Sequence, residues 1–336
     1  MSRPATETAA TVQDASSPRL RIVFMGTPTF SVPALEKIHS AHEIVAVYTQ
    51  PDRPVGRGLE VRQSPVKEKA LSFGLPVYQP EKLSLPGEYE KLAELKPDVI
   101  VVVAYGQILR QNVLDLPRIA CVNIHSSLLP RWRGAAPIHH AMLAGDTVTG
   151  VTTMKMVREL DAGDIYEQVE TKIGEREFVG VLHDRLAVLG GDLILSTIEG
   201  LASGRIEGRA QDPTKVTYAT KLTKEMEALD PKLAAAELDR RVRALNPWPG
   251  TSLFLATAEG KPEERIKVRQ TVPHPTLAAT AGYLQERAGT LVLGTAQGAL
   301  EIQRLQPEGK KEMDSSSFLN GLKGRGIRLP LPVRSG

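Results

Sequence analysis

The run Val99-Ile100-Val101-Val102-Val103-Ala104-Tyr105 is the longest apolar segment of this chain and indicates its fold. It is far shorter than the roughly 20 apolar residues that a membrane-spanning helix needs. Continuous runs of this length, rich in Val and Ile, are typical of strands that a parallel sheet buries on both faces. Three other runs have the same character: Leu20–Met25, Ile44–Tyr48 and Cys121–Ile124.

Amphipathic stretches separate these apolar runs and predict helices. They are Val32–His39, Pro65–Phe73, Tyr89–Leu95 and Ala135–Ala144. Two more strands, Gly150–Met156 and Ile165–Val169, precede a long helix over Val181–Leu201 that stops at Gly204. Strands that alternate with helices in this way predict an α/β domain with a Rossmann-like, mostly parallel sheet.

The second half of the chain has a different pattern. Leu238, Val242 and Leu245 give one helix an apolar face, and Asn246-Pro247-Trp248-Pro249 ends that helix. Short β runs with Gly and Pro turns follow, which predicts a small OB-like β-barrel. These runs are Ser252–Ala256, Arg265–Thr271, Thr290–Gly294 and Ala299–Leu305.

A length of 336 residues favours two domains. We expect a disordered tail over 1–18, a catalytic domain over 19–204, a linker over 205–223 and an OB-like domain over 224–330. The linker is expected because its composition is mixed and polar and its periodicity is weak.

The composition predicts a cytoplasmic protein that binds a polyanion. From Leu222 to the end there are 17 lysines and arginines against 13 acidic residues, whereas the remainder has 25 against 26. A basic half suits a nucleic acid, although a modestly basic domain is also ordinary for a soluble protein. The single cysteine, Cys121, excludes an internal disulfide and fits a reducing compartment. The seven histidines have no metal-ligand spacing, and no secretory signal begins the chain, so we expect neither a metal nor export.

The densest chemical signal follows the strand over Cys121–Ile124. Asn123 and His125 alternate with Ile124, so both side chains point to one face where the strand ends. Open α/β sheets bind ligands at the carboxyl ends of their strands. A later acidic turn, Leu160-Asp161-Ala162-Gly163-Asp164, lies between two predicted strands and can approach His125.

These three residue types suit acyl transfer without a covalent enzyme intermediate. The Asn123 amide can donate to a developing oxyanion, His125 can move protons between attacking and leaving nitrogens, and Asp161 can hold the histidine tautomer. An isolated Asn-x-His pair at a strand end is more often a satisfied pair of loop residues. The long string from Asn123 to Pro137 together with the acidic glycine turn is what favours catalysis.

Taken together, these motifs resemble the folate-dependent formyltransferase family from about Arg21 to the C-terminus. The pattern Asn-x-His, Ser-Leu-Leu-Pro and Asp-x-Gly is specific to formyl transfer in that family. Within the family, the chain is most similar to the branch that formylates methionyl-tRNA. The matching motifs are Met25–Pro28, Thr49–Pro54, Gly56–Gly58, Val103–Gly106, Asn123–Pro137, Leu160–Ile165, Asn246–Pro249 and Gln306–Lys311.

The resemblance implies a role for individual residues. Asn123, His125 and Asp161 would form the catalytic set, and 10-formyltetrahydrofolate would be the co-substrate, with no metal. The folate site would be formed by Ser127, Leu128, Leu129, Pro130, Tyr105, Gly106, Gln107 and Ile108.

Two segments, Thr49–Ser64 and the basic motif Gln306–Lys311, imply that the amine belongs to methionyl-initiator tRNA. We expect the protein to be a monomer. Thr49–Ser64 resembles the loop that enters the acceptor stem in the tRNA branch, and Arg57 occupies the position of its key arginine. Leu59-Glu60 departs from the lysines often found there. The residues implied to contact tRNA are Arg53, Arg57, Arg62, Lys310 and Lys311.

Three other functions deserve comparison. A nicotinamide-dependent oxidoreductase would need a glycine spacing that Gly26-Thr27-Pro28 lacks. A non-catalytic tRNA-binding module would leave the set from Asn123 to Asp161 without a purpose. A formyltransferase acting on a sugar amine or a ribonucleotide amine shares the catalytic set, but those relatives generally lack the basic C-terminal motifs.

Overall fold

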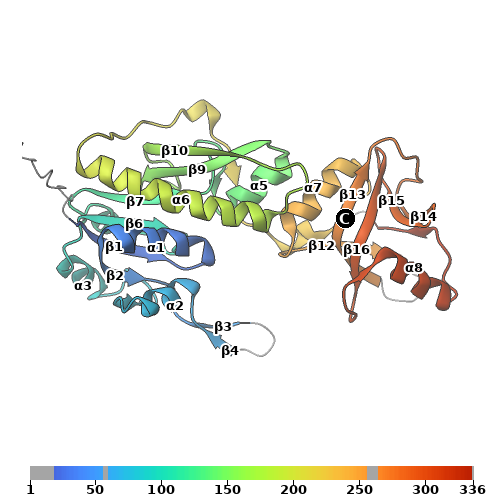
Figure 1. Ribbon diagram of the computed structural model, residues 1–336, viewed down its shortest axis with the longest axis horizontal. Coiled ribbons are helices and arrows are strands. Elements are labelled where there is room, and N and C mark those ends of the chain that lie inside the picture. Colours follow the sequence, from blue (N-terminus) through green and yellow to red (C-terminus); the bar gives the residue numbers. More distant parts are fainter. Residues whose placement is uncertain (1–18, 56–59, 256–263, 335–336) are drawn as a thin grey trace, which may run out of the picture.

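The computed structural model describes residues 19–55, 60–255 and 264–334, which form two units, each built on its own sheet (Figure 1). Within these residues the N-terminal sheet has the strand order β10-β9-β7-β6-β1-β2-β5. Pairing is parallel from β7 to β5, whereas β9 and β10 join antiparallel beyond β7. The prediction of a mostly parallel, Rossmann-like sheet is therefore confirmed. The strands are β1 (Arg21–Gly26), β2 (Glu43–Tyr48), β5 (Val77–Tyr78), β6 (Val99–Val103), β7 (Ala120–His125), β9 (Val148–Lys155) and β10 (Ile165–Lys172).

Apolar residues cover both faces of this sheet. Along β1, Ile22 and Phe24 pack into one cluster and Val23 and Met25 into another, all of them buried. Helices α1, α2, α5 and α6 cover the first face, and α3 and α4 cover the second. Burying one such side chain contributes about 1.5–3 kcal/mol, so continuous apolar strands suit this layered position. The helices are α1 (Val32–Ala41), α2 (Pro65–Ser72), α3 (Glu88–Glu94), α4 (Gln111–Leu114), α5 (Pro137–Ala144) and α6 (Val179–Ala202).

The C-terminal unit is an antiparallel sheet in the order β12-β13-β16-β15-β14-β18, with β17 paired to β16. An antiparallel bridge joins Leu255 of the first strand to Val333, the residue after the last strand, so the sheet curls back on itself. Side chains of α7 and α8 fill its core. The elements are α7 (Ala235–Leu245), β12 (Thr251–Leu255), β13 (Glu264–His274), β14 (Tyr283–Arg287), β15 (Thr290–Gly294), β16 (Ala299–Pro307), β17 (Met313–Asp314), α8 (Ser315–Gly324) and β18 (Leu331–Pro332).

Residues 205–223, expected to be a linker, lie along the N-terminal unit. Strand β11 (Tyr218–Ala219) pairs with β8 (Arg133–Gly134) of the loop that follows β7. Arg209 exchanges two backbone hydrogen bonds with Ile165 at 2.8 and 2.9 Å. Backbone hydrogen bonds thus hold this segment against the N-terminal unit.

The two units meet through α7, which packs on α5 and lies between α6 and the C-terminal sheet (Figure 1). Asp239 on α7 is 2% exposed and accepts hydrogen bonds from Arg176, Arg243 and Thr271, each at 2.8 Å. Because Arg176 precedes α6 and Thr271 lies on β13, one buried carboxylate ties both units together.

Some elements lay outside the sequence prediction. The short strand β5 and the hairpin of β3 (Arg53–Val55) and β4 (Glu60–Arg62) were not expected, nor was α8, whose sequence is rich in Ser and Gly. The Asp314 carboxylate begins α8 by accepting from the Ser317 N–H at 2.7 Å, which compensates for weak helix propensity. Among the residues that the structure describes, no helix is both long and apolar enough to span a bilayer.

Replacing Asp239 tests the junction. Asp239→Ala is expected to lower the free energy of unfolding by about 3–5 kcal/mol, because it leaves the buried Arg243 guanidinium without its carboxylate. Urea denaturation followed by circular dichroism measures this loss. The control Asp192→Ala removes an exposed ion pair with Lys37 and should cost about 1 kcal/mol or less. Equal losses in the two variants would contradict the structural role of Asp239.

Candidate active site

Strand β7 carries the two residues that begin the site. Asn123 and His125 are 9% and 5% exposed, and they share the face that alternation predicted. β7 lies between β6 and β9, with Asn123 opposite Val102 on one side and Met154 on the other. The pair therefore lies at the carboxyl end of a strand where parallel and antiparallel pairing meet.

The His125 ring lies between two oxygen atoms. Its Nε2 is 2.9 Å from the carbonyl oxygen of Trp132, and its Nδ1 is 3.7 Å from Oδ2 of Asp161. Because a carbonyl oxygen only accepts, Nε2 carries the hydrogen of the first contact. The second distance is too long for a hydrogen bond, but it places the Asp161 carboxylate against the other ring nitrogen.

The Asn123 amide is a hydrogen-bond donor without a partner among the described residues. Its side chain makes no hydrogen bond with the residues described, although it is almost completely buried. The amide atoms themselves still reach the surface, and an unpaired amide at a strand end beside a histidine is suited to meet a ligand oxygen.

Backbone geometry fixes Asp161 at the entrance to β10. Asp161 has a left-handed φ of 50°, its Oδ2 accepts from the Gly134 N–H at 2.8 Å, and its carbonyl accepts from Gln211 at 2.8 Å. A side chain at Gly163 would overlap the Lys155 carbonyl oxygen, so this turn requires glycine. Gln211 lies in the expected linker and was missed, because a lone Gln in a polar segment gives no sequence signal.

Hydrogen bonds and apolar contacts hold the Ser127–Pro130 segment in place. The Ser127 hydroxyl is buried and donates to the Arg131 carbonyl at 2.6 Å, while Leu129 packs with Met154 and Ile165. Thr152 accepts from the Leu129 N–H at 3.1 Å and donates to the Ser127 carbonyl at 2.6 Å. The side chains of Ser127 and Leu129 thus shape the loop, which leaves Leu128 and Pro130, both partly exposed, as its accessible members.

The Tyr105–Ile108 loop follows β6, next to β7. The Tyr105 carbonyl accepts from Thr27 and Gln50 at 3.0 and 3.2 Å, and burial raises the pKa of the Tyr105 phenol, which stays neutral. Gln107 donates to the Pro80 carbonyl at 3.0 Å and accepts from the Leu83 N–H at 2.8 Å. Ile108 is 92% exposed, which is unusual for so large an apolar side chain. The loop therefore has a fixed backbone and one free apolar side chain.

The basic residues that were predicted to contact tRNA fall into two groups. Arg53 and Arg62 lie opposite each other in the β3–β4 hairpin, and both are exposed; Arg57 lies outside the described residues. Lys310 borders a hollow of about 340 Å³ in the C-terminal unit that also contains Arg265 and Lys267. These two residues could not be singled out from the sequence, because alternate charged residues of a strand look like ordinary surface. Lys311 is exposed beside the hollow.

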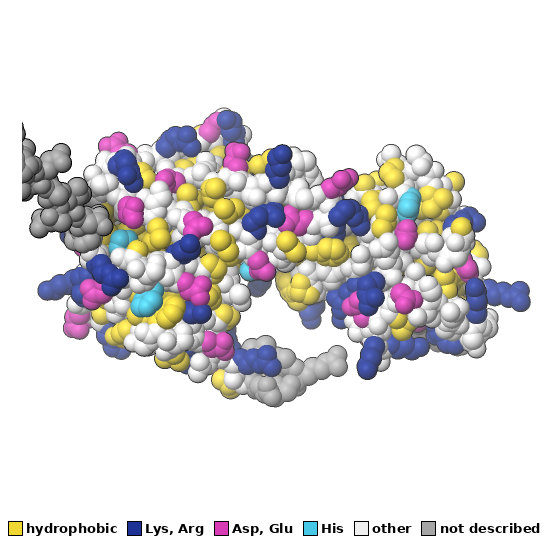
Figure 2. Space-filling model, in the orientation of Figure 1, with side chains coloured by type: hydrophobic (Ala, Val, Ile, Leu, Met, Phe, Trp, Pro, Cys, Tyr) yellow, Lys and Arg dark blue, Asp and Glu magenta, His cyan; other side chains and the backbone are white. Residues whose placement is uncertain are grey.

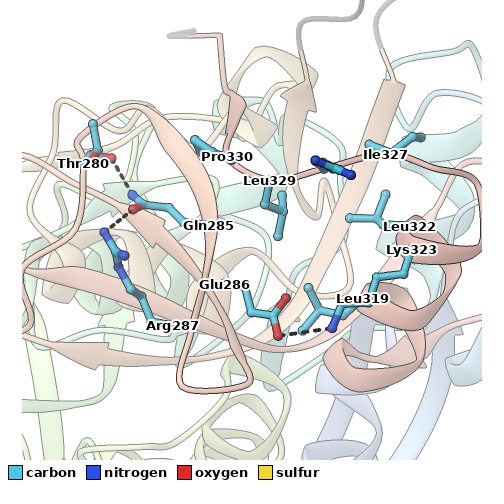
Figure 3. Close-up of a pocket in the computed structure, with 11 residues that line it drawn as sticks. Thr280, Gln285, Glu286, Arg287, Leu319, Leu322, Lys323, Ile327, Leu329 and Pro330 are labelled. Carbon is cyan, nitrogen blue, oxygen red and sulfur yellow. Dashed lines mark hydrogen bonds and ion pairs between the residues drawn. The ribbon is translucent and has the colours of Figure 1, made fainter.

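A second hollow, of about 500 Å³, lies between β14, α8 and the segment before β18 (Figure 3). Apolar side chains such as Leu319, Leu322 and Leu329 line it, with Lys323 paired to Glu286 at its edge. It belongs wholly to the C-terminal unit and contains none of the predicted site residues. In the described part of the chain, no three His, Cys, Asp or Glu side chains are placed to hold a metal ion.

Comparisons with known proteins match this arrangement. A family model described as formyl transferase matches residues 20–198, and one described as formyl transferase, C-terminal domain, matches residues 221–323. The methionyl-tRNA formyltransferase of Methylococcus capsulatus is 47% identical over 311 residues, covering 92% of this chain and 99% of the relative. This chain belongs to the methionyl-tRNA formyltransferase family. The family member of Bacillus subtilis is 45% identical over 303 residues, covering 90% of this chain and 94% of the relative.

Solved structures share the fold at low sequence identity. An N-formyltransferase from Helicobacter canadensis, in complex with folinic acid and dTDP-3-aminofucose, has a TM-score of 0.64 at 16% identity and covers 88% of this chain and 100% of its own. HypX from Aquifex aeolicus, in complex with tetrahydrofolic acid, has a TM-score of 0.60 at 18% identity and covers 93% of this chain and 48% of its own.

The turn at Gly163 offers a direct test of the site's construction. Gly163→Ala is expected to lower the free energy of unfolding by about 1–3 kcal/mol, because the added Cβ must displace the Lys155 backbone. Gly180→Ala is the matched control: nothing lies within 4 Å of a Cβ at that helical position. It should be neutral or stabilising by up to ~1 kcal/mol. Denaturant titration measures both, and a harmless Gly163→Ala would refute the packing described for the turn.

Proposed function

We propose that this chain transfers the formyl group of 10-formyltetrahydrofolate to the α-amino group of methionyl-initiator tRNA, and so supports translation initiation in the cytoplasm. One observation carries the chemistry: the unpaired Asn123 amide lies on the same strand face as His125, whose Nδ1 faces Asp161 at 3.7 Å. The identity of the acceptor is inferred from relatives that match both units of the chain at 45–47% identity.

The reaction begins with attack by a neutral amine. An α-amino group has a pKa of about 8 or below, so a useful fraction is neutral near physiological pH. Its nitrogen forms a bond to the formyl carbon, and the carbonyl electron pair moves to oxygen. The Asn123 amide N–H groups then stabilise the resulting oxyanion.

His125 moves the proton. Since Nε2 is occupied by the Trp132 carbonyl, Nδ1 is the ring nitrogen that accepts the proton of the attacking amine. The Asp161 carboxylate offsets the charge of the imidazolium. The same proton then passes to N10 of the folate as the carbon–N10 bond breaks, which releases tetrahydrofolate and the formylated amine.

The two loops beside β7 suit the folate. Leu128 and Pro130 on one side and Ile108 on the other provide accessible apolar surface, whereas Ser127, Leu129 and Gln107 hold the loops in shape. The backbone of Tyr105 and Gly106 supplies donors and acceptors in fixed directions, which a pterin edge requires.

The tRNA would lie across the two units. Figure 2 shows a hollow between the N-terminal and C-terminal units, with Lys and Arg side chains gathered where the C-terminal unit borders it. The β3–β4 hairpin and α8 both lie on this side (Figure 1). We assign catalysis to residues 19–204 and tRNA binding to 224–330, whose curled antiparallel sheet suits an OB-like barrel. Arg57, Arg53, Arg62, Lys310 and Lys311 would contact its phosphates.

A formyltransferase for a sugar amine is the second candidate. The Helicobacter canadensis structure carries such a substrate, but its likeness to this chain at 16% identity concerns the fold alone. The basic hollow around Lys310 has no evident use with a small sugar nucleotide. The tRNA assignment therefore accounts for more of the molecule.

Substitution of the catalytic set tests the chemistry. Asn123→Ala, His125→Ala and Asp161→Ala should each lower kcat at least ~100-fold, because each removes a group that acts in the transition state. A formyl-transfer assay with charged initiator tRNA measures kcat, and circular dichroism checks folding. Near-normal turnover by folded His125→Ala would reject the assignment.

The tRNA contacts have a separate signature. Arg57→Ala and Lys310→Ala should raise KM for tRNA and reduce the salt dependence of binding by about one phosphate contact each, with KM for the folate unchanged. Lys91→Ala, an exposed lysine on α3 paired with Glu88, is the control and should change neither. Parallel losses for folate and tRNA would argue against a tRNA-specific role.

A further inference from the structure

The Trp132 backbone adopts a conformation that its side chain does not favour. Its φ is 64°, in the left-handed region where residues other than Gly, Asn and Asp are uncommon. This conformation directs the Trp132 carbonyl oxygen to within 2.9 Å of His125 Nε2. Non-glycine residues remain in that region only where surrounding contacts hold them, and such positions cluster at functional sites.

Three contacts hold Trp132. Its N–H donates to Thr217 Oγ1 at 2.9 Å, and its indole Nε1–H donates to Asp146 Oδ2 at 2.8 Å. The Arg131 guanidinium lies over the indole, 4.4 Å from the ring centre, and donates to Asp146 at 3.0 and 2.7 Å. Asp146 raises the pKa of Arg131 through these bonds. Asp146 is thus the point where the indole and the guanidinium are joined.

The end of α5 sets the position of Asp146. Gly145 terminates this helix with a φ of 79°, and the Asp146 N–H donates to the Ala141 carbonyl at 3.0 Å. Within the described residues, the Asp146 side chain bonds to Arg131 and Trp132 and to neither Asn123 nor Asp161. Its side chain is 17% exposed, so the contacts with Arg131 and Trp132 are partly shielded from water.

We propose that Asp146 is a positioning residue for His125. Through the Trp132 indole, it holds the Trp132 carbonyl against Nε2, keeps the hydrogen of the neutral ring on that nitrogen, and leaves Nδ1 to exchange protons. The catalytic consequence rests on the proposed function, whereas the tautomer of His125 is a property of the protein alone.

Nitrogen NMR of ¹⁵N-histidine-labelled protein tests the tautomer directly. In the wild type, the neutral form of His125 should be the Nε2–H tautomer, with its signals identified by their loss in His125→Gln. Trp132→Phe, which keeps an aromatic ring but removes the indole donor, and Asp146→Ala should both shift His125 toward the Nδ1–H form. Arg131→Gln removes the guanidinium contact but leaves the bond between indole and carboxylate in place, so it should shift the tautomer less than either of these variants. A wild-type tautomer in both Trp132→Phe and Asp146→Ala would overturn the proposal.

Steady-state kinetics supply the second readout. Trp132→Phe and Asp146→Ala should lower kcat by about 10-fold or more, part of the ~100- to 10,000-fold that a positioned acid–base group supplies. KM for each substrate should stay within about twofold, because no binding contact is removed. Asp146→Asn, whose amide oxygen still accepts from the indole, should retain most of the wild-type kcat.

The outcomes separate this proposal from the proposed function. A wild type that transfers no formyl group would defeat the function, while the NMR result would still decide the role of Asp146. A rise in KM with unchanged kcat would instead make Trp132 a substrate contact and overturn the positioning role. If Asp146→Ala fails to fold, Trp132→Phe and Asp146→Asn still give both readouts.

Discussion

The contact between His125 Nε2 and the Trp132 carbonyl is the constraint on which the rest of the site depends. It fixes one ring nitrogen as a donor and leaves the other facing Asp161. A histidine free to flip would present either nitrogen and would lose orientation as an acid–base group. The loop that follows β7 must therefore hold the Trp132 carbonyl oxygen within hydrogen-bonding distance of the ring.

That loop is held by segments from distant parts of the sequence. Thr152 on β9 bonds to the backbone of Ser127 and Leu129, and Thr217 bonds to the backbone of Trp132. The Gly134 N–H, further along the same loop, donates to the Asp161 carboxylate. The mixed sheet makes this possible, because the antiparallel strands β9 and β10 bring residues 150–170 beside the end of β7. Hydrogen bonds from Arg176 and Thr271 to Asp239 connect the N-terminal unit to the C-terminal unit.

The sequence predicts the parts of this protein that depend on local periodicity. The apolar runs at β1, β6 and β7 have no other stable place than a doubly covered sheet, and alternation puts Asn123 and His125 on one face. The Trp132 carbonyl and Gln211 could not be predicted, because their roles arise from backbone direction and tertiary contact. Helix α8 was missed for a related reason: its stability comes from Asp314 and from packing of Phe318 and Leu322, while its own residues have weak helix propensity.

The most direct test of the central claim is a formyl-transfer assay that offers the wild-type protein three amines in parallel. With 10-formyltetrahydrofolate as donor, methionyl-initiator tRNA, methionyl-elongator tRNA and free methionine are compared by the formylated product formed. Formylation of the charged initiator tRNA, with little or none of the other two, is the result expected of a site completed by both units. Absence of transfer to methionyl-initiator tRNA, or equal transfer to free methionine, would contradict it.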